Sequence, residues 1–237
     1  MAAGRLFLVP AWLSEASPAA AALPAPALER IRALERFVVE DARSARRFLA
    51  ACGHPKPLRE IAFAELNEHT SPDAVPALLA PLLEGVDVGL LSEAGVPAVA
   101  DPGALLVAAA HARGIAVVPL VGPSSIVLAL MASGLEGQRF RFHGYLPVEG
   151  PARRARLSEL EREAARADET QVFIETPYRN DALLADIVAT CRDATRLAVA
   201  ADLTAPTQWI RMDRVKGWKA SPSPPIGKRP AIFLLHA

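Results

Sequence analysis

Short apolar runs alternate with helix-length segments along the first half of the chain. Apolar runs bounded by Gly, Pro or polar residues predict buried strands at residues 6–9, 37–39, 61–64, 86–91 and 115–119. Helices are predicted between them at residues 26–35, 42–52, 71–83 and 104–113, with Ser71 as an N-cap and Pro72 in the first turn. Near-continuous apolar strands alternating with helices predict a mainly parallel sheet covered on both faces.

A second unit begins near Val121. Helices are predicted at residues 124–131, 153–167 and 180–191, and strands at residues 140–145, 171–175 and 197–201. After Thr204 the pattern changes to short segments at residues 209–212 and 231–235, which suit antiparallel strands, and the Ser/Pro run at 221–225 predicts an exposed loop. We therefore expect an α/β protein of two α/β domains, residues 1–120 and 121–237, with a mainly parallel sheet in the first and a mixed sheet in the second.

Composition suits a globular protein with a sizeable core: 237 residues, 51% hydrophobic and 22% charged, with no net charge. The chain as a whole is therefore no nucleic-acid polycation. Residues 205–237 nevertheless carry six Lys/Arg against one acid, and Arg153, Arg154 and Arg156 form a second basic cluster. Two interpretations stay open for these clusters: solvated surface faces, or contacts to an anionic substrate such as RNA.

Metal, disulfide and membrane signals are weak. Cys52 and Cys191 lack a metal-ligand spacing, and the five histidines show no H-x-x-x-H pattern, so we expect no metal site. The two cysteines are predicted to be buried fillers in a reducing compartment. Residues 5–13 imitate a signal peptide, but Pro10 interrupts the apolar stretch, and no apolar run approaches the roughly 18–20 residues that span a membrane. We expect a cytoplasmic protein.

The most informative segment is residues 92–103, SEAGVPAVADPG, between a predicted strand and a predicted helix. Open α/β sheets bind their ligands at the carboxyl ends of strands. Gly and Pro give such a loop a fixed shape and allow its backbone to approach a ligand closely. The alternative is a plain strand-to-helix connection.

This loop resembles D-A-G-T-P-G-I-S-D-P-G of the ribosomal small-subunit RNA methyltransferase I branch of the tetrapyrrole methylase superfamily. Members of that superfamily transfer a methyl group from S-adenosylmethionine (SAM). Further segments match the branch in the same order: EDAR at 40–43 (E-D-T-R), VGPSS at 121–125 (P-G-P-S-A), SGL at 133–135 (S-G-L), FHGYLP at 142–147 (F-x-G-F-L-P), ETPYR at 175–179 (E-S-P-H-R) and DLT at 202–204 (E-L-T). The resemblance covers most of the chain.

The resemblance implies a cofactor cleft between two domains, with SAM held largely by backbone groups. The implied SAM contacts are Pro10, Ala94, Gly95, Val96, Val99, Ser124, Ser125, Glu175 and Leu203. Ser124 and Ser125 also begin a predicted helix, whose free N–H groups suit a carboxylate, although plain N-caps would use the same residues.

Candidate catalytic residues are Glu40, Asp41 and Arg43, which would position the substrate or assist a hydroxyl nucleophile as a base. The alternative is a surface ion-pair cluster at a helix start, favoured by the helix dipole. For Asp101 the structural interpretation is a helix N-cap or a first-turn acid. Arg179 would hold either a phosphate or an internal carboxylate.

The segments around the predicted acceptor site depart from the branch. Where the branch has A-T-P-I-G-N-L, the chain has VPAWLSE at residues 9–15, so Trp12 and Glu15 alter the rim. The lysine after E-L-T is Ala205 here, and the chain ends without the extra C-terminal segment that the branch usually carries.

The predicted function is a SAM-dependent methyltransferase whose acceptor is ribosomal RNA, methylated at a 2′-hydroxyl.

Alternative functions stay open at this point. One is a SAM-binding protein with another acceptor, a small molecule or a tetrapyrrole, and another is a SAM-binding protein without catalysis. A phosphate-binding nucleotide enzyme is disfavoured, because no G-x-x-x-x-G-K-[ST] loop occurs. We also expect a homodimer, formed through the second domain and the face that carries Trp209 and Trp218.

Overall fold

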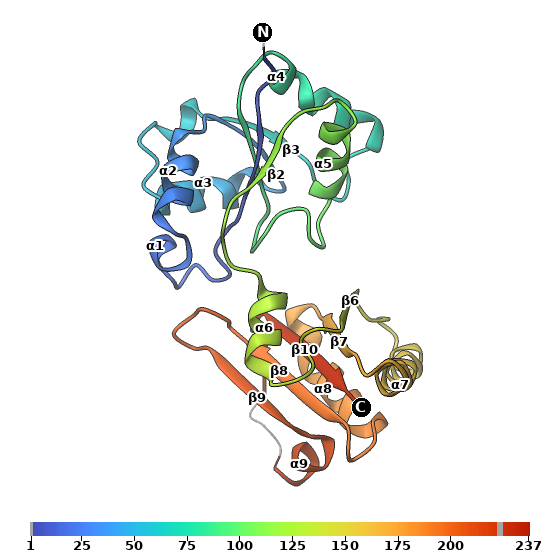
Figure 1. Ribbon diagram of the computed structural model, residues 1–237. Helices are drawn as coiled ribbons and strands as arrows, with labels where there is room; N and C mark the ends of the chain where they lie inside the picture. Colours follow the sequence, from blue (N-terminus) through green and yellow to red (C-terminus); the bar gives the residue numbers. More distant parts are fainter. Residues whose placement is uncertain (1, 222–224) are drawn as a thin grey trace. The chain divides into compact units, whose positions relative to one another are not determined.

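The computed structural model describes residues 2–221 and 225–237. The chain forms two compact units, Met1–Ser124 and Ser125–Ala237, each built on its own five-stranded sheet (Figure 1). The loop predicted at 221–225 falls on residues 222–224, outside the described residues. No helix in the described part of the chain is long and apolar enough to cross a membrane.

The first unit is a doubly covered parallel sheet with strand order β3-β2-β4-β1-β5. Its strands are β1 (Leu6–Val9), β2 (Arg36–Val39), β3 (Ala62–Glu65), β4 (Val88–Leu91) and β5 (Val117–Pro119). Its helices are α1 (Ala19–Ala22), α2 (Ala25–Ala33), α3 (Ala42–Ala51), η1 (Leu58–Glu60), η2 (Pro72–Leu79), α4 (Ala80–Leu83) and α5 (Gly103–His111). The predicted parallel sheet is confirmed.

Alternate strand residues fill two separate cores. Phe7 and Phe37 face α2 and α3, where Ile31 and Phe48 complete one apolar cluster. The neighbouring strand residues Leu6 and Val38 point to the opposite face of the sheet. There they join the apolar residues Leu79, Leu82 and Leu106. Burial on both faces explains why these strands are near-continuous apolar runs in the sequence.

Proline changes the helix predicted at residues 71–83. Ser71 caps it as expected, with its hydroxyl accepting the N–H of Asp73 at 3.3 Å. Residues 72–79 form a 3₁₀ helix, followed by the short α4. Pro76 lies inside the segment and lacks the N–H that a continuous α-helix would need. The single predicted helix is therefore replaced by two shorter pieces.

The second unit has a mixed sheet with strand order β6-β7-β10-β8-β9. Its strands are β6 (Phe140–Tyr145), β7 (Thr170–Ile174), β8 (Arg196–Ala201), β9 (Trp209–Arg214) and β10 (Ala231–His236). Its helices are α6 (Ser125–Ser133), α7 (Gly150–Ala167), η3 (Pro177–Arg179), α8 (Asn180–Thr190) and α9 (Val215–Ala220). β6 and β7 are parallel, whereas β10 pairs antiparallel with β7 and β8, and β8 antiparallel with β9. The mixed sheet is confirmed.

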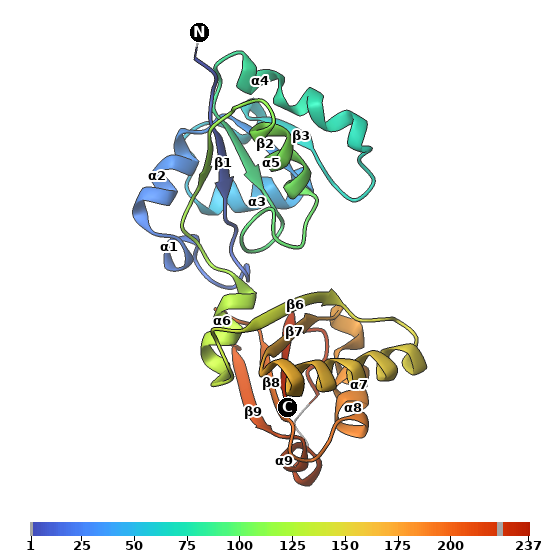
Figure 2. The ribbon, with the colours of Figure 1, turned by 45° about the vertical axis from the view of Figure 1, so that its right-hand side comes forward.

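Helices cover both faces of this sheet. Phe173, Val199 and Phe233 point into the main core with residues of α7 and α8, and α7 packs on β7 and β10 (Figure 2). The alternate residues of β8 and β10 face the other side, where α6 packs (Figure 1).

The prediction that a face carrying Trp209 and Trp218 forms a dimer interface is wrong. Trp218 is 3% exposed and lies in the main core, where its indole N–H donates to the Leu197 carbonyl at 3.1 Å. Trp209 packs against it edge to face at 6.2 Å. Trp218 lies on α9, a helix missing from the predicted elements, and its packing explains why such a polar segment is ordered.

Candidate active site

Three loops meet at one edge of the first sheet. β2, β4 and β1 are parallel neighbours, so the segments that follow them, beginning at Glu40, Ser92 and Pro10, emerge at the same carboxyl-terminal edge. The amide N–H of Ala11 donates to the Gly95 carbonyl at 2.8 Å and ties the loop after β1 to the loop after β4. This edge is where open α/β sheets bind ligands.

The loop at 92–103 has a strained backbone. Gly95 has φ +73°, and Ala98 and Ala100 have φ +65° and +64°. A left-handed conformation costs a residue with a Cβ about 1–2 kcal/mol. Asp101 offsets this cost, because its Oδ1 accepts the N–H groups of Ala98 at 3.0 Å and of Gly103 at 2.7 Å.

The strain is concentrated in two predicted cofactor segments. Among the described residues, five non-glycine residues have positive φ: Ala98, Ala100, Asp168, Asp202 and Thr204. Asp168 ends helix α7, which is an ordinary place for this conformation. The other four lie in the 92–103 loop and on either side of Leu203. Such strain persists where the surrounding structure holds it, often at ligand sites.

The loop also presents small side chains and available donors. Within the described part of the chain, no hydrogen bond uses the backbone N–H groups of Ala94, Gly95 or Val96. A Cβ on Gly95 would lie 3.2 Å from a methyl carbon of Leu13 and 3.4 Å from the Pro123 carbonyl oxygen. The segment before Ser124 thus lies against the loop, and Gly122 packs on the ring of Pro10. The structure therefore brings Pro10, Gly95 and the approach to Ser124 together.

The two predicted catalytic carboxylates differ in their environment. Half-buried Glu40 accepts the N–H of Glu93 at 3.1 Å, and burial raises its pKa above the ordinary value. Asp41 caps helix α3 by accepting the N–H of Ser44 at 2.7 Å, and this bond lowers its pKa. Arg43 is exposed in the first turn of α3. Asp41 therefore has a structural task, while Glu40 lies beside the 92–103 loop with its charge disfavoured. Burial raises the pKa of Asp101 as well.

A cleft of about 250 Å³ adjoins these groups. Its lining comes from three segments: Trp12, Leu13, Ser14, Glu15, Ser44, Arg47, Glu93 and Ala94. The Trp12 ring rests edge to face on Phe48 at 5.5 Å, and Arg47 pairs with Glu15 at 3.0 Å. Sequence reasoning identified Trp12 and Glu15 at the rim but missed Ser44 and Arg47. Arg47 could have been found from its place one helical turn after Arg43.

In the second unit, Glu175 and Leu203 leave the sheet at the same edge, because β7 and β8 run in the same direction on either side of β10. The Glu175 side chain is fully buried, and its Oε1 accepts Nε and Nη2 of Arg179 at 2.9 and 2.6 Å. Its Oε2 is buried without a partner among the described residues. Arg179 therefore holds an internal carboxylate, which is one of the two roles predicted for it. Ser125 is the first residue of α6.

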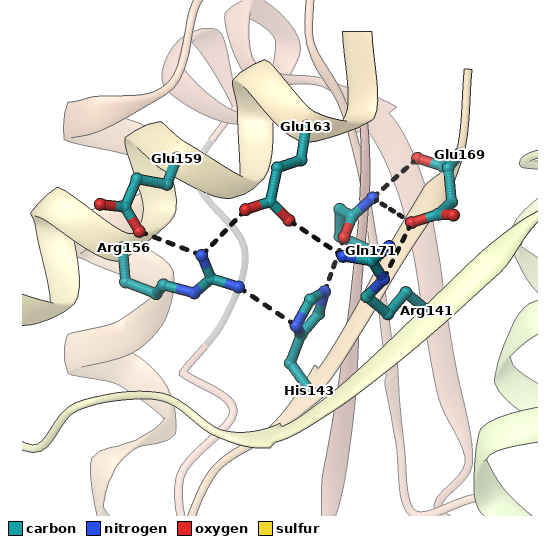
Figure 3. A network of polar contacts seen from close by, with 7 residues as sticks. All are labelled: Arg141, His143, Arg156, Glu159, Glu163, Glu169 and Gln171. Atoms are coloured by element: carbon teal, nitrogen blue, oxygen red, sulfur yellow. Dashed lines mark hydrogen bonds and ion pairs between the residues drawn. The ribbon is translucent and has the colours of Figure 1, made fainter. Parts of the chain in front are cut away.

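The basic cluster at 153–156 is neutralised within the chain. Arg153 is 6% exposed and pairs with Asp186 at 2.6 Å, and Arg154 contacts the same carboxylate at 3.1 Å. Arg156 belongs to a network with Glu159, Glu163 and His143 (Figure 3). Much of this cluster therefore joins α7 to neighbouring elements.

That network joins α7 to the edge strand β6 and its neighbour β7. The His143 Nε2–H donates to Oε1 of Gln171 at 2.6 Å, since the Gln171 amide donates to Glu169, and Nδ1 faces Arg156 at 3.4 Å (Figure 3). Arg141 adds ion pairs to Glu163 and Glu169. Sequence reasoning assigned these residues no role, because the contacts join segments far apart in the chain.

No group of three or more Cys, His, Asp and Glu suited to a metal ion occurs in the part of the chain that the structure describes. Cys52 and Cys191 are buried and unpaired, and burial raises the pKa of each thiol to about 12.

A parallel sheet with a strained, donor-rich loop at its carboxyl edge, together with a mixed sheet in a second unit, defines a two-unit α/β protein. The sequence profile of the tetrapyrrole (corrin/porphyrin) methylases matches residues 19–216, so the chain belongs to this family of methyltransferases. Solved structures share the fold. The methyltransferase CobJ matches with a TM-score of 0.64 and 17% identity over 98% of this chain and 94% of that chain. Uroporphyrin-III-C-methyltransferase from Thermus thermophilus matches with a TM-score of 0.55 and 21% identity over 98% of this chain and 92% of that chain.

Curated relatives point to one branch of the family. The chain is similar to ribosomal RNA small subunit methyltransferase I of Xylella fastidiosa (38% identical, covering 72% of this chain and 59% of the relative). It is also similar to the enzyme of that name from Escherichia coli O157:H7, with 32% identity over 95% of this chain and 70% of the relative. The enzyme of that name from Pseudomonas aeruginosa is 34% identical over 94% of this chain and 76% of the relative. The chain thus spans little more than half of the Xylella relative. The predicted superfamily and branch are confirmed.

Proposed function

We propose that this chain transfers the methyl group of SAM to a ribose 2′-hydroxyl of ribosomal RNA. Its curated relatives are named as ribosomal RNA small subunit methyltransferases. The observation that carries the proposal is the 92–103 loop, whose left-handed backbone leaves the N–H groups of residues 94–96 available at the sheet edge. Such a loop suits a ligand bound mainly through backbone contacts.

The residues at the carboxyl-terminal edge of the first sheet fit SAM. Ala94, Gly95 and Val96 would offer N–H donors, while Pro10 and Val99 would supply apolar contacts. Ser124, Ser125, Glu175 and Leu203 stay predicted SAM contacts, of which Glu175 has a buried oxygen without a partner among the described residues. When bound, SAM supplies a methyl carbon activated by a positively charged sulfur. The protein's task is then mainly positioning and exclusion of water.

Glu40 is the proposed base. A 2′-hydroxyl must lose its proton as its oxygen forms the bond to the methyl carbon, while the carbon–sulfur bond breaks and its electron pair stays on sulfur. The half-buried Glu40 carboxylate has a raised pKa, which makes it a better proton acceptor than an exposed glutamate. Asp41 would fix the start of α3, and Arg43 and the cleft beside Trp12 would hold the acceptor.

The test is methyl transfer with a defined acceptor. Small ribosomal subunits from a strain lacking the gene should gain one methylated nucleotide, detected by mass spectrometry, when incubated with SAM and the protein. Subunits from the parent strain should gain none. SAM binding without any methylated RNA would instead support a SAM-binding protein with another acceptor or without catalysis.

We also propose that the protein is a cytoplasmic homodimer, because ribosome assembly occurs in the cytoplasm and symmetric pairs are the commonest soluble oligomers. Light scattering should give twice the 25.2 kDa of one chain. A mass near that of one chain at micromolar concentration would contradict the dimer.

A further inference from the structure

Both tyrosines of the chain are strongly exposed at one edge of the second sheet. The sequence holds two tyrosines, and their exposed fractions are 61% for Tyr145 and 74% for Tyr178. Tyr145 ends β6, and Tyr178 lies in η3 just after β7. Because β6 and β7 are parallel neighbours, the two aromatic rings emerge at the same edge. Exposed aromatic side chains that gather at one sheet edge are candidates for a binding surface.

An arginine lies at the same sheet edge. Arg179 directly follows Tyr178 in η3, just after β7, the strand that pairs with β6. Two hydrogen bonds to the buried Glu175 carboxylate hold the Arg179 guanidinium in place. An arginine fixed in this way loses little side-chain entropy when a ligand stacks on its planar group.

The supporting elements are also held. β6 is an edge strand, and the network of Arg141, His143 and Arg156 ties it to α7 and β7 (Figure 3). On the other side, the Asn180 side chain donates to the carbonyls of Gly227 and Arg229 at 3.2 and 2.7 Å. The aromatic surface is therefore carried by well-anchored segments.

Charged side chains of both signs flank this surface. Asn180, directly after Arg179 in the chain, binds the carbonyls on either side of the exposed Lys228. Arg154 follows β6 at the start of α7 with a side chain that is 46% exposed. Arg154 is ion-paired with Asp186, and Glu149 and Asp181 are exposed acids of the adjoining segments. Two aromatic rings and a planar guanidinium at one sheet edge match the stacked bases of a single-stranded nucleic acid.

We propose that Tyr145, Tyr178 and Arg179 form a stacking surface for unpaired bases of the RNA acceptor. The inference rests on the proposed function, because it assumes that RNA is the substrate. A protein partner is the competing occupant, but interface anchors of that kind favour well-packed pockets, whereas these rings are 61% and 74% exposed at an open sheet edge. Stacking does not depend on base identity, so the surface would hold the strand and leave sequence selection to other residues.

The test measures RNA and SAM binding on the same full-length variants. Tyr145→Leu/Tyr178→Leu removes both rings, Tyr145→Phe/Tyr178→Phe keeps them, and Phe140→Leu is a matched control that removes an exposed ring at the other end of β6. Arg179 stays unchanged because of its bond to Glu175. Fluorescence anisotropy follows a labelled single-stranded oligoribonucleotide and its duplex, and calorimetry follows SAM.

Each single leucine variant should bind the single strand about tenfold more weakly, and the leucine pair about a hundredfold more weakly. The phenylalanine pair and Phe140→Leu should bind RNA like the parent, and all variants should bind SAM. Each single leucine variant should show part of the loss, which keeps the test valid if the pair is poorly folded.

Equal RNA affinity of the parent and the leucine pair would overturn the stacking surface and leave the RNA acceptor standing. A parent that binds SAM but neither RNA form would overturn the surface and the RNA acceptor together. If the parent is a dimer and the Tyr145→Leu/Tyr178→Leu variant has the mass of one chain, the two rings belong to a contact between copies. That result would also overturn the proposal.

Discussion

Gly95 meets two constraints at a single residue. Its φ of +73° is costly for any residue with a Cβ, and a side chain there would contact Leu13 and the Pro123 carbonyl. Glu40 and Asp41 show a second contrast at this scale. They are adjacent in sequence, yet burial raises the pKa of one carboxyl while a hydrogen bond lowers that of the other.

Gly95→Val should abolish SAM binding and lower the free energy of unfolding by about 2 kcal/mol, the scale of backbone strain. Gly114→Val is the matched control, because Gly114 also has positive φ, but a Cβ on it would have no neighbouring atom within 4 Å. It should lose similar stability and still bind SAM in calorimetry. If Gly95→Val bound SAM like the parent, the loop would have a structural role only.

Glu40→Gln and Asp41→Asn should change stability in opposite directions at neutral pH. The raised pKa of Glu40 means that its ionised form destabilises the fold, so glutamine should stabilise it, and the gain should fade as pH falls through that pKa. The lowered pKa of Asp41 gives stability that is present above its unfolded value of about 3.9 and is lost at lower pH. Urea denaturation from about pH 7 to about pH 2 measures both. A destabilised Glu40→Gln at neutral pH would contradict this account.

At the scale of elements, the Asp101 side chain bridges two backbone groups of loop 92–103. Asp101 Oδ1 accepts two backbone N–H groups and so fixes the left-handed residues on which the proposed SAM site depends. Helix α3 begins similarly at the Asp41 cap, which orients Ser44 and Arg47 toward the cleft beside Trp12.

Asp101→Ala should weaken SAM binding by about tenfold or more, because the loop would pay its ordering cost on binding. The two released hydrogen bonds should also cost about 1–3 kcal/mol of stability. Asp101→Asn keeps an acceptor oxygen and should recover much of both losses. Equal SAM affinity of the alanine variant and the parent, measured by calorimetry, would show that the loop holds its shape without Asp101.

At the scale of the whole molecule, two units each have their own sheet and apolar core. Ligand binding to the folded chain stabilises it by mass action. SAM or S-adenosylhomocysteine at a hundredfold excess over Kd should add about 2.7 kcal/mol, which raises Tm by several degrees for a chain of this size.

ATP and NAD at the same concentrations should leave Tm unchanged, and Gly95→Val should lose the response to SAM. Differential scanning calorimetry provides the measurement. A Tm that responds to neither SAM nor S-adenosylhomocysteine would contradict the methyl-donor site.

The sequence alone determined the strands, the two sheet types and the family, because apolar periodicity and Gly/Pro loops are local signals and short motifs identify relatives. Only the tertiary structure decided that Asp41 caps a helix, that Arg179 binds Glu175, that Trp218 is a core residue and that residues 71–83 form two pieces. Each depends on partners or backbone angles that a sequence pattern does not specify. A side chain's chemistry allows several partners, and its position in the fold selects among them.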